Sequence, residues 1–159
     1  MSMAWGAMLS VMPTPLKSLP YPQPTSAAVT AVMKGNRRTD TRPEVRVRSL
    51  LHRAGLRFRK NLLIRTDELS VRPDIVFTRA RVAVFIDGCF WHSCPDHGTT
   101  PRANTGYWGP KLERNLARDA RVNAALCSAG WAVVRIWEHV NPTKAAARVA
   151  ATVQSVMAE

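Results

Sequence analysis

The stretch that decides the fold is residues 81–97, which read RVAVFIDGCFWHSCPDH. Its first half, from Val82 to Ile86, is an unbroken and largely β-branched apolar run, which predicts a buried strand. Asp87-Gly88 is a turn signal that ends this strand. A carboxylate, two thiols, two aromatic rings and two imidazoles then come in close succession. Such chemistry is typical of a functional site rather than of a strand end.

Residue types that bind zinc recur at short spacing in this stretch, where Cys89, Cys94 and His97 form a C-x4-C-x2-H pattern. A tetrahedral zinc takes about four such ligands, so one further ligand is needed. His139 and Cys127 are the nearest candidates, although a small buried apolar role suits Cys127 better. A turn with incidental thiols is the alternative for the whole pattern.

The composition indicates one basic domain. The chain has 159 residues, with 23 Lys and Arg against 11 Asp and Glu, so its formal charge is +12. The excess is mostly Arg, whose planar fork suits phosphate, so a polyanion is the expected partner and a merely basic soluble protein is the alternative. Three cysteines, no signal peptide pattern and no apolar run of about 18 residues predict a cytoplasmic protein without a membrane span.

The N-terminal part divides into a tail and an arm. Residues 1–24 are rich in proline and predict a disordered tail, which leaves residues 25–159 as a single domain. Residues 25–40 predict an arm that contacts DNA and carries one flexible apolar side chain able to wedge into a base stack. A solvated linker is the alternative. The candidate contacts in this arm are Met33, Arg37 and Arg38.

Apolar periodicity and turn signals predict the elements of the domain. A helix is expected over residues 41–54, where Thr41 and Glu44 match a capping box and Gly55 follows the end. Glu44 is either only a cap or also a residue that orients a catalytic group. The other expected elements are a strand over 56–59, a loop over 60–72, strands over 75–77, 82–86 and 131–137, a helix over 107–129 with Leu112, Leu116 and Ala120 on its apolar face, and a helix over 142–158.

The strands over 75–77 and 82–86 predict an antiparallel hairpin, because only a short turn separates them. Asp74 begins the first strand and Asp87 follows the second, so the hairpin would place both carboxylates beside the main-chain carbonyl of Ile86. An oxygen-rich site of this kind suits Mg²⁺ completed by waters and a substrate phosphate. The alternative for Asp74 is a turn or cap residue.

The helix over 107–129 carries several bases and one acid among them, Asp119. Asp119 is either a surface ion-pair partner or a residue that supports the site. The strand over 131–137 ends at His139, where a neighbouring strand could bring this ligand type to the cysteines. The candidate phosphate contacts on the helix are Lys111, Arg114 and Arg118.

These motifs resemble the very short patch repair (Vsr-type) DNA mismatch endonucleases, in order and at compatible spacing from about Met33 to His139. The strings that carry the resemblance are RPDIVF at 72–77, DGCFWH at 87–92, YW at 107–108 and WEH at 137–139. The resemblance implies an α/β fold, namely a restriction-endonuclease-like mixed sheet flanked by helices, with a structural zinc site. It also implies an enzyme that nicks one strand beside the thymine of a T:G mismatch left by deamination of 5-methylcytosine.

The resemblance further implies roles for single residues in hydrolysis. Asp74 would bind Mg²⁺ together with the backbone carbonyl of Ile86. His92 would be the catalytic histidine, with Glu44 as its carboxylate partner. The chain departs from the best-studied branch at Asp87, where that branch has a histidine facing an acid that matches Asp119. The pair here would be two carboxylates, with Asp87 as a second metal ligand.

The remaining implied roles concern DNA and zinc. Phe90 and Trp91 would wedge into the duplex beside the mismatch, and Met33 would enter from the opposite groove. The residues at or near the zinc positions are Cys89, Cys94, His97 and His139.

Two other functions stay open at this point. One is a restriction-type endonuclease that cuts both strands of matched DNA, and the other is a non-catalytic, zinc-stabilised DNA-binding module. A binding module would need neither Asp74, Asp87 nor His92. For the nicking enzyme we expect a monomer that is associated with the nucleoid through DNA and makes transient contacts with other repair proteins.

Overall fold

The structure is a computed structural model, and it describes residues 39–99 and 101–158. The predicted tail over 1–24 and the arm residues Met33, Arg37 and Arg38 lie outside this described part. The elements in chain order are α2 (Arg42–Arg53), β1 (Arg59–Lys60), β2 (Ile64–Arg65), β3 (Ser70–Val71), β4 (Ile75–Phe77), β5 (Val82–Asp87), α3 (Thr105–Ser128), β6 (Ala132–Trp137) and α4 (Pro142–Ala158).

A four-stranded mixed sheet in the order β1-β4-β5-β6 forms the centre of the domain. β4 pairs antiparallel with β1 and β5, and Ile75 lies opposite Val84, which confirms the predicted hairpin. β6 pairs parallel with β5. Two parallel neighbours need a long crossover connection, and α3 supplies it.

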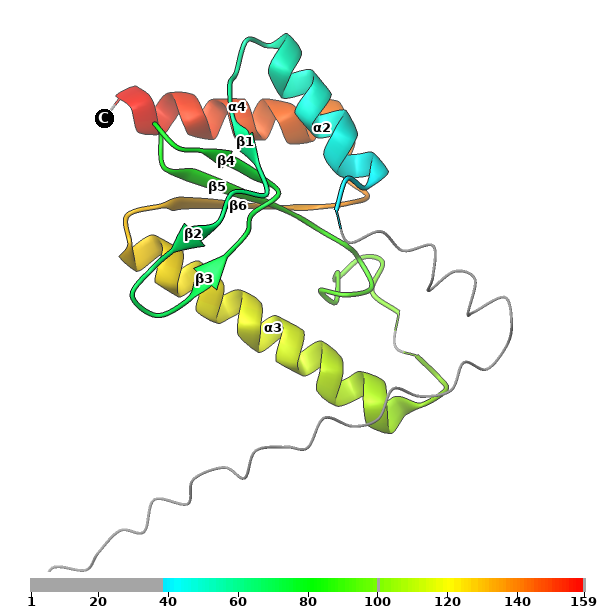
Figure 1. Cartoon of the computed structure of the whole chain (residues 1–159). Helices are drawn as coiled ribbons and strands as arrows, with labels where there is room; N and C mark the ends of the chain where they lie inside the picture. Colours follow the sequence, from blue (N-terminus) through cyan, green and yellow to red (C-terminus); the bar gives the residue numbers. More distant parts are fainter. Residues whose placement is uncertain (1–38, 100, 159) are drawn as a thin grey trace, which may run out of the picture.

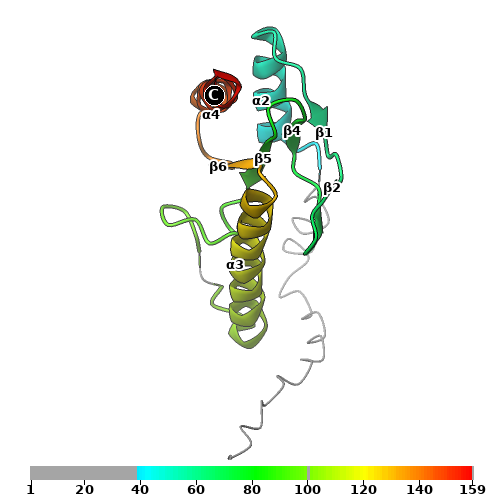
Figure 2. The ribbon, with the colours of Figure 1, turned by 90° about the vertical axis from the view of Figure 1, so that its left-hand side faces the viewer.

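Helices cover both faces of the sheet, with α2 and α4 on one side and α3 with the small β2–β3 hairpin on the other (Figures 1 and 2). Side chains alternate along each strand, so Val82 and Val84 join the core under α2 and α4, whereas Ala83 joins the core beside α3. This arrangement confirms the predicted α/β class with a mixed sheet flanked by helices.

The predicted helix stops are confirmed. Gly130, at φ +75°, donates its N–H to the carbonyl of Cys127 at 2.9 Å and turns the chain from α3 into β6. The capping box expected at the start of α2 is not formed, because the side chain of Thr41 makes no cap hydrogen bond. Glu44 accepts hydrogen bonds from the N–H of Asp40 at 2.9 Å and from the hydroxyl of Thr41 at 2.7 Å. The backbone donor therefore comes from one residue earlier than in a standard box.

The strand predicted over 56–59 and the loop predicted over 60–72 are wrong in their bounds. Leu56 and Phe58 pack against the core instead, and β1 begins only at Arg59. The stretch expected to be a loop contains the β2–β3 hairpin, in which Ile64 pairs with Val71. Strands of two residues are too short to show an alternating pattern.

The apolar face predicted for α3 is also wrong, because Leu116 is 46% exposed. The first half of α3 extends beyond the sheet, so only its later turns pack against strands (Figure 1). The buried residues of α3 are Trp108, Val122, Ala125 and Leu126.

None of the described helices is long and apolar enough to cross a membrane.

Candidate active site and metal centre

The site is built where the parallel strands β5 and β6 end side by side. Asp87 is in register with Trp137, and the N–H of Glu138 donates to the carbonyl of Asp87 at 2.9 Å. The loop that follows β5 and the residues that follow β6 therefore meet at one edge of the sheet. This register brings together side chains that are about fifty positions apart in the sequence.

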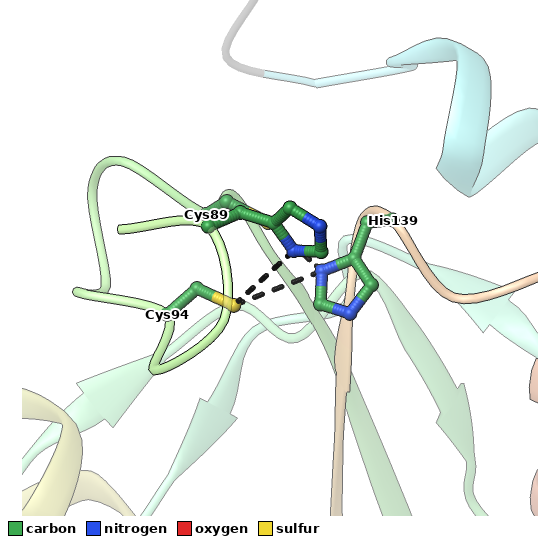
Figure 3. A group of neighbouring side chains, drawn as sticks. Cys89, Cys94 and His139 are labelled. Carbon is green, nitrogen blue, oxygen red and sulfur yellow. Dashed lines mark hydrogen bonds between the residues drawn. The ribbon is translucent and has the colours of Figure 1, made fainter. Parts of the chain in front are cut away.

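Two cysteines and two histidines meet at this edge, and their possible ligand atoms all lie within 4.8 Å of one another. The Sγ of Cys89 lies 3.1 Å from Nδ1 of His139. The Sγ of Cys94 lies 3.7 Å from the same nitrogen, a contact drawn as a dashed line in Figure 3. His97 completes the group, with Nδ1 4.0 Å from the Sγ of Cys94. The structure thus brings the four predicted ligand residues together in one cluster. Cys127 is exposed rather than buried, and it lies outside this cluster.

Tight turns fix the conformation of the loop that follows β5 and carries Cys89, Cys94 and His97, here called the ligand-bearing loop. The N–H of Cys94 donates to the carbonyl of Cys89 at 2.9 Å, and the N–H of Gly98 donates to the carbonyl of Cys94 at 2.7 Å. A Cβ atom on Gly98 would come within 2.4 Å of that same carbonyl oxygen, so glycine is required there. The side chain of Glu138 accepts a hydrogen bond from the N–H of Cys89 at 2.7 Å, which ties the loop to the end of β6.

The donor set fits a tetrahedral zinc. Bonds of about 2.0–2.3 Å to nitrogen and sulfur place tetrahedral ligands roughly 3.3–3.8 Å apart. Three separations in this cluster are 3.1, 3.7 and 4.0 Å, and all of the separations are within 4.8 Å. Burial, and then the neighbouring Cys94, raise the pKa of the Cys89 thiol to about 11. A bound divalent cation would oppose this effect by stabilising the thiolate. With two cysteines and two histidines the coordination would be closed, as in a structural site rather than a catalytic one.

A cluster of carboxylates lies beside the hairpin. Asp74 accepts a hydrogen bond from the N–H of Ile86 at 2.7 Å, as the predicted hairpin requires. Burial raises the pKa of Asp74 to about 6, and the charges of Glu44 and Asp87 act in the same direction, against the hydrogen bond from Ile86. Negative charge is therefore concentrated where water is scarce. A divalent cation such as Mg²⁺ would relieve it, and Asp74 and Asp87 could hold that ion.

His92 has a different partner from the one expected. Its Nδ1 forms a close hydrogen bond with Oδ2 of Asp119 and lies 3.7 Å from Oδ1 of Asp87. Glu44 lies instead in the network at the start of α2, 3.8 Å from a guanidinium nitrogen of Arg48. In the structure His92 is therefore paired with Asp119 rather than with Glu44, because α3 passes beside the loop and presents Asp119 to it. Of the two interpretations of Asp119, the structure supports the one that places it in the site.

Sequence reasoning missed Arg135, which joins the two acids beside His92. Its guanidinium lies 2.8 Å from Oδ1 of Asp87 and 3.2 Å from Oδ1 of Asp119. The signal that could have found it is a charged residue in the middle of an otherwise apolar strand, since a charge at such a place needs partners.

The predicted wedge residues, Phe90 and Trp91, are packed rather than free. Their rings are 5.1 Å apart, and they lie 5.4 Å and 5.9 Å respectively from the ring of Trp108, which is itself only 6% exposed. Asn115 donates to the carbonyl of Trp91 at 3.0 Å. Both rings keep part of their surface open to solvent. They therefore form a rigid aromatic unit that packs against Trp108 of α3.

The bases predicted to contact phosphate lie along one stripe of α3. Lys111 lies 3.3 Å from the hydroxyl of Tyr107, while Arg114 donates to the carbonyl of Pro110 at 3.0 Å. Arg118 is more than half exposed and lies 3.4 Å from Asp119. Spacings of three and four residues keep the stripe on one side of the helix.

A carboxylate cluster, a histidine–aspartate pair and a basic helix, gathered at one edge of a mixed sheet, are typical of metal-dependent nucleases. The comparisons with known proteins agree with this class. The sequence model of the family described as DNA mismatch endonuclease Vsr matches residues 24–96. This match includes the arm, the hairpin and the first part of the ligand-bearing loop.

Individual relatives extend the similarity further along the chain. The type II nicking enzyme V.NaeI of Lentzea aerocolonigenes is 53% identical over 133 residues, which are 83% of this chain and 80% of the relative. V.XorIIP of Xanthomonas oryzae pv. oryzae, also named a type II nicking enzyme, is 44% identical over 67% of this chain and 76% of its own length. DNA mismatch endonuclease Vsr of Escherichia coli is 37% identical over 62% of each chain. The chain belongs to the Vsr family, and it is therefore a DNA endonuclease.

Proposed function

We propose that this endonuclease nicks one strand of duplex DNA beside the thymine of a T:G mismatch, by Mg²⁺-dependent hydrolysis of a phosphodiester. The observation that carries the proposal is that the aromatic pair Phe90 and Trp91 directly precedes His92 in one short, tightly held loop. Two aromatic rings that can insert into a base stack and a histidine that can activate water therefore lie on one rigid loop. The names of the nicking relatives and of the Escherichia coli mismatch endonuclease agree with it.

The aromatic pair would select the mismatch through the energy of unstacking. Inserting a ring between base pairs costs a few kcal/mol, and it costs least where the pair is already weak. Because Trp108 supports Phe90 and Trp91, little side-chain entropy would be lost when they insert. Met33, outside the described residues, would enter from the opposite groove.

The side chains around His92 suit proton transfer. The carboxylate of Asp119 accepts from Nδ1–H, which leaves the lone pair of Nε2 to take a proton from the attacking water. Asp74, the carbonyl of Ile86 and Asp87 would hold Mg²⁺ next to this histidine. When bound, that ion would stabilise the charge that develops on the phosphate and on the leaving oxygen.

The other parts of the proposal concern support and binding. Zn²⁺ held by Cys89, Cys94, His97 and His139 would fix the loop between β5 and α3. The mixed sheet flanked by helices would belong to the restriction-endonuclease-like fold. Lys111, Arg114 and Arg118, with Arg37 and Arg38 of the arm, would contact the DNA backbone without reading sequence. We expect the protein to act as a monomer, and DNA binding would place it at the nucleoid.

The test is strand-specific cleavage of end-labelled duplexes that carry a T:G pair in a pool of flanking sequences. A fully matched pool is the control, and both pools are incubated with and without Mg²⁺. The proposal predicts a nick on the T strand only, in the mismatched pool only, and only with Mg²⁺. Cleavage of both strands of matched DNA would replace the proposal by a restriction-type activity.

A further inference from the structure

Arg135 lies in the middle of β6, opposite Phe85 on the neighbouring strand β5. Apart from this residue, β6 is apolar from Ala132 to Trp137. A cation in such a strand is costly unless it is paired, and only 21% of the Arg135 side chain is exposed. Its partners therefore indicate why a charge is placed there.

Each nitrogen of the Arg135 guanidinium has its own oxygen partner. Nε donates to Oδ1 of Asn123 at 2.9 Å, Nη1 donates to Oδ1 of Asp87 at 2.8 Å, and Nη2 lies 3.2 Å from Oδ1 of Asp119. The centre of the group lies 4.7 Å from the centroid of the Phe85 ring. Because the guanidinium is a planar fork, these contacts fix its position and its plane together.

This fork divides the oxygens of the acids around His92. Arg135 takes Oδ1 of Asp119, and the other oxygen, Oδ2, takes the hydrogen bond from Nδ1 of the imidazole. Arg135 also takes Oδ1 of Asp87, which lies 3.7 Å from the same imidazole nitrogen. Two carboxylates thus approach one histidine, and the guanidinium of Arg135 compensates both of them. Arg118 adds a contact of 3.4 Å to Oδ1 of Asp119 only.

We propose that Arg135 is a positioning residue of the endonuclease. It holds Asp87 and Asp119 side by side and, through Asp119, fixes the orientation and the tautomer of His92. The inference rests on the catalytic role proposed for His92 and adds a residue that acts through Asp119 without touching the DNA. It also explains how the chain accommodates an acid at position 87 beside a second acid.

A merely structural role for Arg135 is the competing explanation, since its side chain also packs on Phe85 and bonds Asn123. Asn123→Ala is the matched control, because it removes a hydrogen bond from the same guanidinium and leaves the two carboxylates in place. The kinetic variants are Arg135→Gln, which loses the charge, and Arg135→Lys, which keeps the charge but not the fork.

The first measurement is the single-turnover nicking rate constant, together with the affinity for the same duplex. We expect Arg135→Gln to lower the rate constant roughly 10- to 100-fold, the range for losing a hydrogen bond between charged groups. We expect Arg135→Lys to fall between that variant and the unchanged protein, and Asn123→Ala to lose less than about threefold. Affinity for DNA should stay the same in all three. In an Asp119→Asn background, the further loss from Arg135→Gln should be smaller than in the unchanged protein, because the route through Asp119 is already broken and only the contact with Asp87 remains.

The second measurement does not need DNA. Nitrogen-15 NMR of the imidazoles, with His92 assigned by comparison with His92→Ala, reports which ring nitrogen carries the proton. The unchanged protein should hold the proton on Nδ1, and Arg135→Gln should lose this single form. An unchanged His92 spectrum in Arg135→Gln, or a full additional rate loss in the Asp119→Asn background, would overturn the inference. Absence of nicking by the unchanged protein would instead count against the proposed function, while the NMR result would still decide the role of Arg135.

Discussion

Replacing Asp74 by asparagine should make the protein more stable and inactive at the same time. Asp74 is a half-buried carboxyl whose pKa is raised from 3.8 to about 6, chiefly by burial. A displacement of a little over two pH units corresponds to ~3 kcal/mol of cost for the ionised form, at ~1.4 kcal/mol per unit. Since the group is partly solvated, we expect Asp74→Asn to raise the free energy of unfolding by ~1–3 kcal/mol at pH 8. The amide oxygen can still accept the hydrogen bond from Ile86.

The pH dependence of this gain follows from the raised pKa. The folded protein ionises Asp74 less readily than the unfolded chain. Below pH 3.8 the carboxyl is protonated in both states and costs no stability, whereas the free energy of unfolding falls as pH rises through about 6 and Asp74 ionises in the folded protein. The difference between Asp74→Asn and the unchanged protein should therefore be largest above about pH 7, fall to about half by pH 5 and vanish below about pH 4. Added Mg²⁺ should stabilise only the unchanged protein and so narrow the difference at pH 8.

The assay is urea unfolding followed by fluorescence at several pH values. The buffers contain no added Mg²⁺ and no chelator, so that any metal bound to the Cys/His cluster of the purified protein is not removed. Nicking of a T:G duplex by Asp74→Asn should be lost, while its affinity for that duplex stays the same. If Asp74→Asn were less stable than the unchanged protein by the same amount at pH 5 and pH 8, the reasoning would be refuted. That result would mean that the fold does not disfavour the ionised form of Asp74.

Three further outcomes are expected. Trp91→Ala should weaken binding to a T:G duplex more than binding to a matched duplex, measured by fluorescence anisotropy; equal losses on both would contradict the wedge. Cys89→Ser should lower zinc content by elemental analysis and the melting temperature together, whereas Cys127→Ser, which alters an exposed thiol outside the cluster, should change neither. Unchanged zinc in Cys89→Ser would exclude that site. His92→Ala and Asp119→Asn should each slow nicking by roughly 100-fold or more, and the double variant should be little worse than His92→Ala alone, because the two act as one unit; additive losses would separate them.

The parts that the sequence predicted well depend on strand order and backbone pairing. An apolar run followed by Asp87-Gly88 is enough to place the end of β5, and a two-residue shift of register would have moved Asp74 away from Ile86. The Cys/His cluster follows in the same way, because β5 and β6 are parallel neighbours and His139 comes directly after β6. Residue types at strand ends are therefore informative as soon as the pairing is known.

The parts that it predicted poorly depend on the rotation of helices. Whether Glu44 of α2 or Asp119 of α3 would reach His92 depends on how each helix is turned toward the loop, and apolar periodicity gave the wrong face for the first half of α3. The charge of Arg135 within an apolar strand was a usable signal, but its partners come from β5 and α3, and no short sequence pattern connects them.

The most direct test of the proposed function is a two-colour nicking assay on a single T:G duplex in the context that the pooled substrates select. Each strand carries its own dye, and the matched C:G duplex of the same sequence is measured in parallel under single-turnover conditions with Mg²⁺. We expect cleavage of the T strand beside the mismatched thymine, an intact G strand, and no cleavage of the matched duplex on the same time scale. Equal cleavage of the matched and mismatched duplexes, or breaks in both strands, would contradict mismatch nicking as the function of this protein.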